Sequence, residues 1–411
     1  MGSDVRKTLQ TRVAFIGCGP GGSGPIVAAT QRGRLTELLD SGICVVDQEE
    51  CFRSSALRRF DLNSDSTATS FLEASDNLHV QQALALDPQA AARQRLLPLR
   101  HQHAPLSLIA DYLDWLGDGF RRRVKESNAS YLLDRTIATR VSLRQQGGFQ
   151  IDLHRSGETF SLLSEIAVFG LGAEPYVPAT VPIDLHSDQL LSGKSTDWIE
   201  HRLESIDHPR VLIHGGSHSA FSAAWYLLNR TRVRWPEGGI VIAARDQPRI
   251  FYPDAASAHR EQYSYAADDV CPITGRIHRL GGLRGDGREV ARRVFGFSDQ
   301  TEPRVRFVET ISADARFDLT IGALGYRPRT LPMVDVNGEA IALQPHVDHN
   351  SHLVRADGTP IEQAFGIGLA AGFRPPGERS FQGQTNGVWL YQNEIGDRIL
   401  HRLLKRRSEI A

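Results

Sequence analysis

Cysteine and methionine are scarce in this sequence of 411 residues, which has only two methionines. Its four cysteines are Cys18, Cys44, Cys51 and Cys271. No two of them form a C-x-x-C pair, which excludes the redox dithiol of disulfide reductases and the usual zinc spacings. His101 and His103 have no further ligands at zinc spacing, so we expect no metal site. Such cysteine usage is typical of a reducing compartment, and we expect a cytoplasmic protein.

The sequence also lacks an excess of charge and a long apolar run. Its 47 lysines and arginines nearly balance its 48 aspartates and glutamates. This balance argues against nucleic acid and acidic membrane surfaces as main partners. No apolar run is long enough to span a bilayer, and the first residues lack a signal-peptide core, so we expect no membrane partner. The length predicts two or three domains. The sequence leaves open whether the chain forms a homo-oligomer.

A glycine-rich turn follows the first apolar run. Residues 13–16 predict a short buried strand, and residues 43–47 predict a second strand that ends in an acid. Between them lies a G-x-G-x-x-G pattern that opens a helix. These glycines permit a tight turn, the approach of a pyrophosphate and close helix packing, and the acid can hold ribose hydroxyls. The predicted dinucleotide-binding residues are Gly17, Gly19, Pro20, Gly21, Gly22 and Asp47.

Residues 209–245 repeat this design with a less regular turn. A strand at 210–214 leads into the turn, and the helix after it leads to a strand that ends in Arg245. An arginine at this strand end suits the 2′-phosphate of NADPH better than the bare ribose of NADH. The alternative is that Arg245 is an ordinary solvated charge. The predicted residues of this second site are Gly215, Ser217, His218, Ser219, Ala220 and Arg245.

Apolar periodicity predicts the remaining elements. Helices are expected at residues 104–125 and 386–405, and short strands at 305–307 and 319–321. Residues 136–170 alternate apolar and polar side chains around a glycine turn, which predicts a small antiparallel meander.

Three further segments resemble a known family. Residues 169–173 and 318–328 look like the two segments that cross between the domains of two-dinucleotide-binding flavoproteins. The second contains A-L-G-Y, similar to the A-T-G-Y motif of single-component flavin monooxygenases of the ornithine/lysine N-hydroxylase type, with Leu324 in place of threonine. Residues 364–368 resemble the terminal FAD strand, although Leu369 stands where many relatives have aspartate. The resemblance covers nearly the whole chain and adds to the cofactor-binding residues Gly172, Gly325, Tyr326 and Gly368.

The resemblance implies an α/β fold with two Rossmann-like dinucleotide-binding domains and a small antiparallel β-meander. The NAD(P)-binding domain, residues 201–317, would be inserted into an FAD-binding domain of residues 1–200 and 318–411. The implied protein is an FAD- and NADPH-dependent monooxygenase that N-hydroxylates a small amine or amino acid through a C4a-hydroperoxyflavin, with molecular oxygen as co-substrate. Alternatives are an NAD(P)H-dependent flavin reductase or dehydrogenase, a flavin oxidase, and a non-enzymatic flavin-binding redox sensor.

Two pairs of residues are candidates for contact with the flavin. Asn63 and Ser64 lie in a stretch that passes near the flavin in this architecture, where they could act as hydrogen-bond donors. The alternative is a turn that caps a helix expected at residues 67–74. Thr385 and Asn386 precede the last predicted helix, whose positive end would point at the flavin.

An insert at about residues 250–290 is the expected substrate-facing segment. Its Phe251-Tyr252-Pro253 stretch loosely resembles an F-x-P segment of the amine hydroxylases, which implies a substrate contact for Tyr252. Arg284 could hold a substrate carboxylate through its planar fork. A surface ion pair between Arg284 and Asp286 is the alternative.

Overall fold

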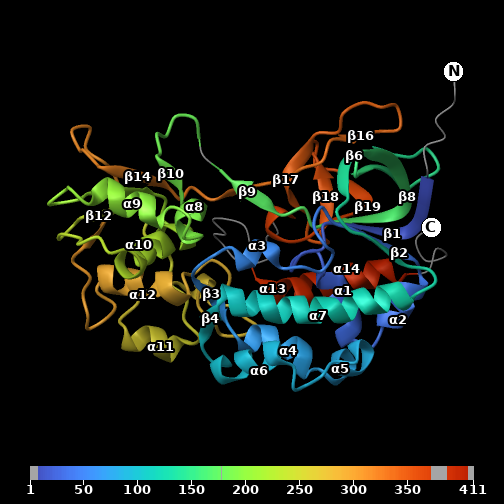
Figure 1. Cartoon of the computed structure of the whole chain (residues 1–411), viewed down its shortest axis with the longest axis horizontal. Coiled ribbons are helices and arrows are strands. Elements are labelled where there is room, and N and C mark those ends of the chain that lie inside the picture. Colours follow the sequence, from blue (N-terminus) through green and yellow to red (C-terminus); the bar gives the residue numbers. More distant parts are fainter. Residues whose placement is uncertain (1–7, 177, 372–386, 406–411) are drawn as a thin grey trace.

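The computed structural model describes residues 8–176, 178–371 and 387–405. The protein is a mixed α/β structure with two main sheets and helices packed around them (Figure 1). The larger sheet, on the right in Figure 1, has ten strands, and the smaller sheet, on the left, has five.

The centre of the larger sheet is parallel and is built from the apolar runs of the sequence. Strand β1 (Thr8–Ile16) lies between β2 (Ile43–Val46) and β8 (Glu158–Phe169) and is parallel to both. Beyond these lie β5 (Tyr131–Leu133) and β19 (Pro360–Gly366), also in parallel. The inner residues of β1 and β2 are fully buried, as expected for strands covered on both faces. The two strands predicted around the first glycine turn are confirmed.

Antiparallel strands extend the larger sheet on the β8 side. The hairpin of β6 (Ile137–Leu143) and β7 (Phe149–Arg155) pairs with the first half of β8, which confirms the predicted meander. β16 (Met333–Val334) lies beside β6, and β17 (Leu343–Val347) and β18 (His352–Arg355) lead antiparallel into β19. The last residues of β8 pair in parallel with β19, so β8 belongs to both the antiparallel and the parallel part of the sheet.

Several helices share one hydrophobic core with the larger sheet. Among them are α1 (Gly24–Gln31), α7 (Leu106–Glu126) and α14 (Gly396–Leu403). A short helix α13 (Val388–Leu390) and a π-helical turn (Tyr391–Ile395) run directly into α14, so the described part of the predicted C-terminal helix is confirmed. The shorter helical elements of this part are α2 (Leu35–Asp40), α3 (Ser55–Arg58), α4 (Thr69–Asp76), α5 (Leu78–Leu84), α6 (Ala91–Leu96), η1 (Leu97–Leu99) and η3 (Leu369–Ala371).

The smaller sheet is parallel throughout. Its strands in spatial order are β10 (Leu185–His186), β14 (Leu319–Gly322), β11 (Val211–His214), β12 (Ile240–Ala243) and β13 (Val305–Val308). Helix α10 (His218–Arg230) connects β11 to β12 and packs against α12 (Gly285–Val294). The remaining helical elements here are α8 (Ser187–Leu191), α9 (Thr196–Leu203), α11 (Ala255–Arg260) and η2 (Ala267–Asp269).

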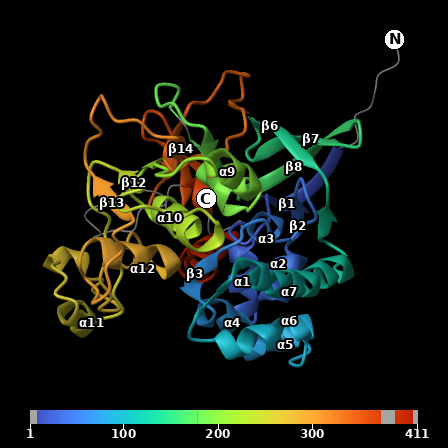
Figure 2. The same cartoon turned by 60° about the vertical axis from the view of Figure 1, so that its left-hand side comes forward.

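Two short strand pairs lie where the two parts of the molecule meet. β9 (Ala173–Pro175) pairs antiparallel with β15 (Tyr326–Pro328), and both strands are in the segments that cross between the sheets (Figure 1). β3 (Asn63–Thr67) pairs with β4 (His103–Pro105) and lies beside α12 of the other part (Figure 2). We call the contact between β3 and α12 the seam.

The strand β3 corrects one alternative from the sequence. Helix α4 begins at Thr69, and its N-cap is Ala68, which provides no side-chain hydrogen bond. Asn63 and Ser64 are therefore strand residues, and their interpretation as a helix-capping turn is wrong. Within the described ranges, no helix has the length and apolarity that a bilayer crossing requires.

Candidate functional site

The first glycine turn leaves β1 at its carboxyl end, and the chain itself requires two of its glycines. Gly17 has a φ of +83°, and a Cβ there would lie 2.5 Å from the carbonyl oxygen of Gly170. A Cβ on Gly22 would lie 2.0 Å from the carbonyl oxygen of Gly17. These contacts bring the turn, the end of β8 and the start of α1 together more closely than any side chain allows. Gly17 and Gly22 are thus explained by packing.

Gly19 differs because packing does not explain it. Among the described residues, a Cβ on Gly19 would meet no atom closer than the carbonyl oxygen of Arg53, at 4.0 Å. The open side lies at the amino end of α1, whose N-cap Ser23 makes no side-chain capping bond. A pyrophosphate binds where backbone N–H groups at a helix start and the space beside a glycine are available to it. The turn therefore fits a dinucleotide at the position that the sequence predicts.

Other predicted residues of the first site lie around this turn. Gly21 is in close contact with Gly368, because a Cβ on Gly21 would lie 3.0 Å from the Gly368 Cα. Both Gly172 and Gly368 have positive φ, and no atom of the described residues lies within 4 Å of a Cβ built on Gly172. The turns after β1, β8 and β19 thus meet at one edge of the larger sheet, where ligands bind in open parallel sheets. Pro20 lies within the first of these turns.

Asp47 has a structural role in addition to the predicted ribose contact. Its Oδ2 accepts a hydrogen bond of 2.7 Å from the backbone N–H of Cys18, and its Oδ1 accepts one of 2.9 Å from that of Glu49. The carboxylate therefore fastens the glycine turn to the end of β2. Each oxygen has a second lone pair, so these bonds leave room for ribose hydroxyls. Burial raises the pKa of the Cys18 thiol, with further contributions from Cys51 and Asp47, so this thiol stays neutral.

The second glycine turn repeats the packing of the first. Gly215 has a φ of +127°, and a Cβ there would lie 2.1 Å from the carbonyl oxygen of Ala323, at the second crossing segment. Gly216 is also required, because its Cβ would lie 2.5 Å from that of Ala244. Sequence reasoning left Gly216 out, although the Gly-Gly doublet after a strand was a visible signal. Ala220 is fully buried beneath the turn.

Polar residues of the second turn face outward at the start of α10. Ser217 is the exposed N-cap of this helix and makes no side-chain capping bond. His218 and Ser219 follow in its first turn and are partly exposed. Arg245 is exposed just after β12 and forms no ion pair with a carboxylate of the described residues. These groups suit a phosphate-bearing ligand, and the solvated-charge alternative for Arg245 stays open.

Tyr326 links the second crossing segment to the second turn. Its hydroxyl donates a hydrogen bond to the Asp188 carboxylate in α8 and also interacts with Ser219. Burial, and then Asp188, raise the pKa of Tyr326, so the phenol remains protonated. Gly325 beside it has a φ of +90° and faces open space. The two predicted cofactor residues of this segment therefore lie close to the start of α10.

Asn63 and Ser64 lie at the seam. The side-chain amide of Asn63 donates to both carboxylate oxygens of Asp286 in the first turn of α12, at 3.0 and 3.3 Å. His103 Nδ1 lies 2.8 Å from the carbonyl oxygen of Ser64, and since a carbonyl only accepts, Nδ1 carries the proton. Burial raises the pKa of Asp286. Sequence reasoning considered His103 only as a metal ligand, and no local pattern indicated its place beside Ser64.

Of the two predicted substrate residues in the insert, Tyr252 is enclosed by the protein and Arg284 is partly exposed. Tyr252 is fully buried, and its hydroxyl donates a hydrogen bond of 2.8 Å to Glu261 within the insert. This burial argues against the predicted substrate contact of Tyr252. The guanidinium of Arg284 stacks on the ring of Phe251, 3.6 Å from the ring centre. The alternative ion pair between Arg284 and Asp286 does not form; Asp286 is bound by Asn63 instead.

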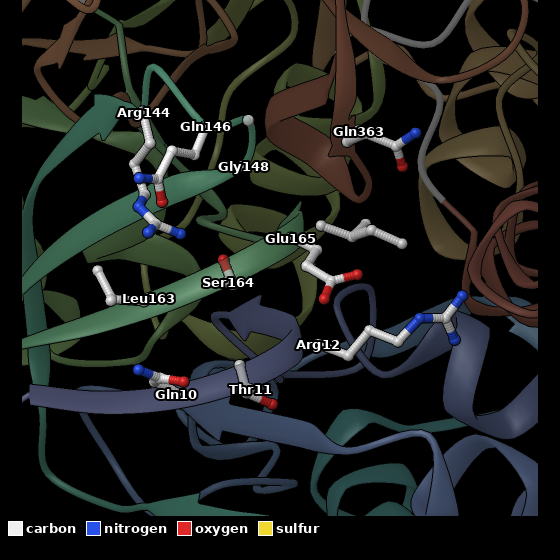
Figure 3. A pocket seen from close by; sticks show the side chains of 12 residues that line it. Gln10, Thr11, Arg12, Arg144, Gln146, Gly148, Leu163, Ser164, Glu165 and Gln363 are labelled. Atoms are coloured by element: carbon white, nitrogen blue, oxygen red, sulfur yellow. The ribbon is translucent and has the colours of Figure 1, made fainter. Parts of the chain in front are cut away.

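A hollow of about 700 Å³ lies away from both glycine turns. Side chains from the first half of β1, from β8 and from the β6–β7 turn surround it, including Thr11, Ser164 and Arg144 (Figure 3). These positions precede the carboxyl ends of β1 and β8, so this hollow is not the dinucleotide site. Thr385 and Asn386 lie outside the described residues. Among the described residues, no three His, Cys, Asp or Glu side chains gather as metal ligands would.

The comparisons with known proteins agree with this geometry. No family model matches the chain. A CMP-5'-(3-aminopropyl)phosphonate hydroxylase of Streptomyces rubellomurinus is 29% identical, over 96% of this chain and 98% of the relative. An ornithine hydroxylase of Pseudomonas aeruginosa has a TM-score of 0.56 at 14% identity, over 96% of this chain and 99% of that one. An ornithine N-hydroxylase of Kutzneria sp. 744 has a TM-score of 0.54 at 13% identity, with the same coverage. The chain therefore has the fold of these hydroxylases.

Proposed function

We propose that this chain, which shares its fold with ornithine hydroxylases, is an FAD- and NADPH-dependent monooxygenase that hydroxylates the nitrogen of a small amine or amino acid. The observation that supports it most is the pair of similarly built glycine turns on two parallel sheets, with open space at Gly19. The 29% identical relative is named for an aminopropyl compound, which favours an amine as the substrate. We assign the FAD-binding domain to the part built on the larger sheet and the NADPH-binding domain to the part built on the smaller sheet, about residues 185–323. These bounds are wider than the predicted 201–317, because β10, α8 and β14 belong to the smaller sheet and its core.

The residues around the two turns divide the binding tasks. Gly19, Gly172 and Gly368 would leave room for FAD, and Asp47 would hold its ribose while it fastens the turn. Ser217, Ser219 and Arg245 would bind the phosphates of NADPH, with Tyr326 positioning the start of α10 through Asp188. A bound flavin would supply the redox chemistry, namely acceptance of hydride from NADPH and activation of molecular oxygen.

The chain's own contribution is to hold the reactants and to exclude water. Ser64 is buried at the seam and Asn63 and Asp286 are half-buried, and this partial exclusion of water strengthens electrostatic interactions with a bound ligand. His103 Nδ1 donates to the Ser64 carbonyl oxygen, which leaves Nε2 as the ring nitrogen that can exchange a proton. This nitrogen can hold a proton that the amine loses before it attacks oxygen.

A direct experiment tests the proposed function. The purified protein is loaded with FAD and supplied with NADPH, an amine panel and isotopically labelled oxygen. We expect amine-stimulated NADPH oxidation and labelled hydroxylamine. Electron transfer to a quinone without label in the product would instead identify a flavin reductase or dehydrogenase. Failure of NADPH to reduce the flavin would indicate an oxidase or a redox sensor. NADPH oxidation without the protein, and without FAD, serves as the control.

A further inference from the structure

A short segment of the part with the larger sheet packs into the core of the other part. Residues 59–64, which we call the arm, run from the end of α3 into β3. The side chains of Phe60 and Leu62 pack against the hydrophobic core of the smaller sheet, which also contains residues of α10 and α12. The arm therefore supplies apolar side chains to a core that is otherwise built from residues 185–323.

Polar contacts join the arm to three helices of the part with the smaller sheet. The backbone N–H of Asp61 donates a hydrogen bond of 2.8 Å to the carbonyl oxygen of Leu191, the last residue of α8. The Asp61 carboxylate lies 3.6 Å from the guanidinium of Arg230, at the end of α10. At the seam, Asn63 binds Asp286 in the first turn of α12. A large rotation of one part against the other would have to break these contacts.

The arm is also fixed to the part that it comes from. The backbone N–H of Phe60 donates to the carbonyl oxygen of Leu57 in α3, at 3.2 Å. The N–H of Leu106, the first residue of α7, donates to the carbonyl oxygen of Leu62 at 2.9 Å. The last two residues of the arm belong to β3, which pairs with β4. Because backbone hydrogen bonds hold it in its own part, the arm is not a loose linker.

Other contacts join the two parts at separate places. Arg279 of the insert pairs with Glu394 and stacks over Trp389, both of which directly precede α14. The crossing strands β9 and β15 pair with each other. Two parts of one chain usually move relative to each other unless their interface is large and apolar. Here the arm adds apolar packing, and the separate contacts oppose rotation about any one of them.

We infer that the arm holds the two nucleotide sites in one relative orientation throughout turnover, so that NADPH passes its hydride to the flavin without a rotation of one part against the other. Phe60 is the positioning residue for this orientation, because its side chain is the largest that the arm places in the other core. This inference rests on the proposed function. It adds a conformational requirement to it: the two nucleotide sites already face each other before NADPH binds.

A reversible crosslink tests whether the two parts move. Asp61→Cys and Arg230→Cys place exposed thiols at neighbouring positions of the arm and α10, whereas the four natural cysteines are buried. A short bis-methanethiosulfonate bridges the new thiols, and a thiol reductant removes the bridge. The rate of flavin reduction by NADPH should agree within about twofold in the bridged and released proteins. A bridge that stops reduction until it is removed, or thiols that the reagent cannot bridge, would overturn the inference.

Variants of Phe60 assign the orientation to the arm. Phe60→Ala should lower the rate of flavin reduction at least about tenfold, because displaced reactants lose rate, and should change the KM for NADPH less than about threefold. Phe60→Leu, which keeps an apolar side chain in the core, should recover most of the rate. The bridge between positions 61 and 230 should also restore the rate of Phe60→Ala, whereas a defect confined to folding would not respond to it.

A phenylalanine of the same core provides the matched control. Phe297 packs against this core but belongs to the part with the smaller sheet itself. Phe297→Ala should therefore lower the melting temperature, as Phe60→Ala does, without slowing flavin reduction. Equal slowing in both variants, or an unchanged rate in Phe60→Ala, would show that Phe60 does not position the two parts.

A distance measurement separates this inference from the proposed function. Spin labels on Arg155→Cys in β7 and Glu237→Cys before β12, both exposed positions, report the separation of the two parts by pulsed electron paramagnetic resonance. The FAD-loaded protein should give one narrow distance distribution that NADP⁺ does not shift, and Phe60→Ala a broader one. If no amine is hydroxylated, the proposed function fails, and the distribution still decides whether the arm fixes the parts. Two distances, or a shift with NADP⁺, would overturn the inference.

Discussion

Glycines of the same sequence motif stand at their positions for different physical reasons in this protein. Gly22 faces the carbonyl oxygen of Gly17 at a distance that no side chain tolerates, whereas Gly19 faces open space. The first is required by the packing of the chain on itself, whereas no described residue packs closely enough to require the second. Substitutions at the two positions should therefore fail in different ways.

Gly19→Val should fold and lose FAD, because its side chain would occupy the open space without touching the chain. Gly22→Val should unfold or melt well below the wild type, because its Cβ would lie 2.0 Å from the Gly17 oxygen. Circular dichroism melting and flavin absorbance after gel filtration measure the two effects. A Gly19→Val protein that keeps its flavin would contradict the assignment of FAD to this turn.

Arg245 should determine the choice of nicotinamide nucleotide. Loss of a charged hydrogen bond of about 1.5–3 kcal/mol should raise the KM for NADPH roughly 10- to 150-fold in Arg245→Ala and leave that for NADH nearly unchanged. Arg245→Lys is the matched control and should retain part of the preference. Steady-state oxidation of both nucleotides decides the matter, and an equal loss for both would show that Arg245 acts on structure.

At the scale of elements, a half-buried ion pair joins α7 to the loop after β5. Arg121 donates to both oxygens of Asp134, at 2.7 and 2.9 Å, and Asp134 also accepts from the backbone N–H of Cys51 at 2.9 Å. Burial alone would raise the pKa of Asp134, but the Arg121 and Cys51 hydrogen bonds outweigh it and hold the pKa well below its usual range.

This low pKa makes the folded state sensitive to acid. A depressed carboxylate contributes stability above its unfolded pKa of about 3.9, and this is lost as the pH falls toward the folded pKa. Asp134→Asn should therefore lower the free energy of unfolding by about 1–3 kcal/mol near neutral pH. The difference in the free energy of unfolding between wild type and variant should shrink steadily as the pH is lowered below about 4. Urea unfolding at several pH values measures this, and a difference that does not change with pH would refute it.

The sequence predicts the elements better than the contacts between them. The strands beside both glycine turns, the meander and α7 depend on local apolar patterns, and all were predictable. The bond between Asn63 and Asp286 joins residues 223 positions apart, so no local pattern contains it. Tyr252 shows the same limit: the F-x-P resemblance placed it near the substrate, but its burial depends on how the insert folds onto Glu261.

At the scale of the whole molecule, the seam joins the part with the larger sheet to the part with the smaller sheet. Asn63→Leu would remove the amide that binds Asp286 and leave this half-buried carboxylate without that partner. We expect the rate of flavin reduction by NADPH to fall at least about tenfold, because even a small displacement of two reactants lowers their reaction rate by such a factor. FAD retention and the KM for NADPH should change little. Anaerobic stopped-flow absorbance measures the rate, with Ser66→Ala on the same strand as the control. Unchanged reduction in Asn63→Leu would show that the seam does not align the cofactors.

The pairing of β8 with β19 has a consequence for synthesis on the ribosome. The partner residues Ala167 and Ala364 are about 200 residues apart, and the whole smaller sheet lies between them in the chain. At typical translation rates the edge of β8 therefore waits roughly 10 to 40 s for its parallel neighbour. Meanwhile β7 already covers the first half of β8, so only its last residues stay open to wrong partners. Ribosome-bound chains that end before β19 should accordingly be cleaved by protease near residues 167–169 and become protected once β19 has emerged.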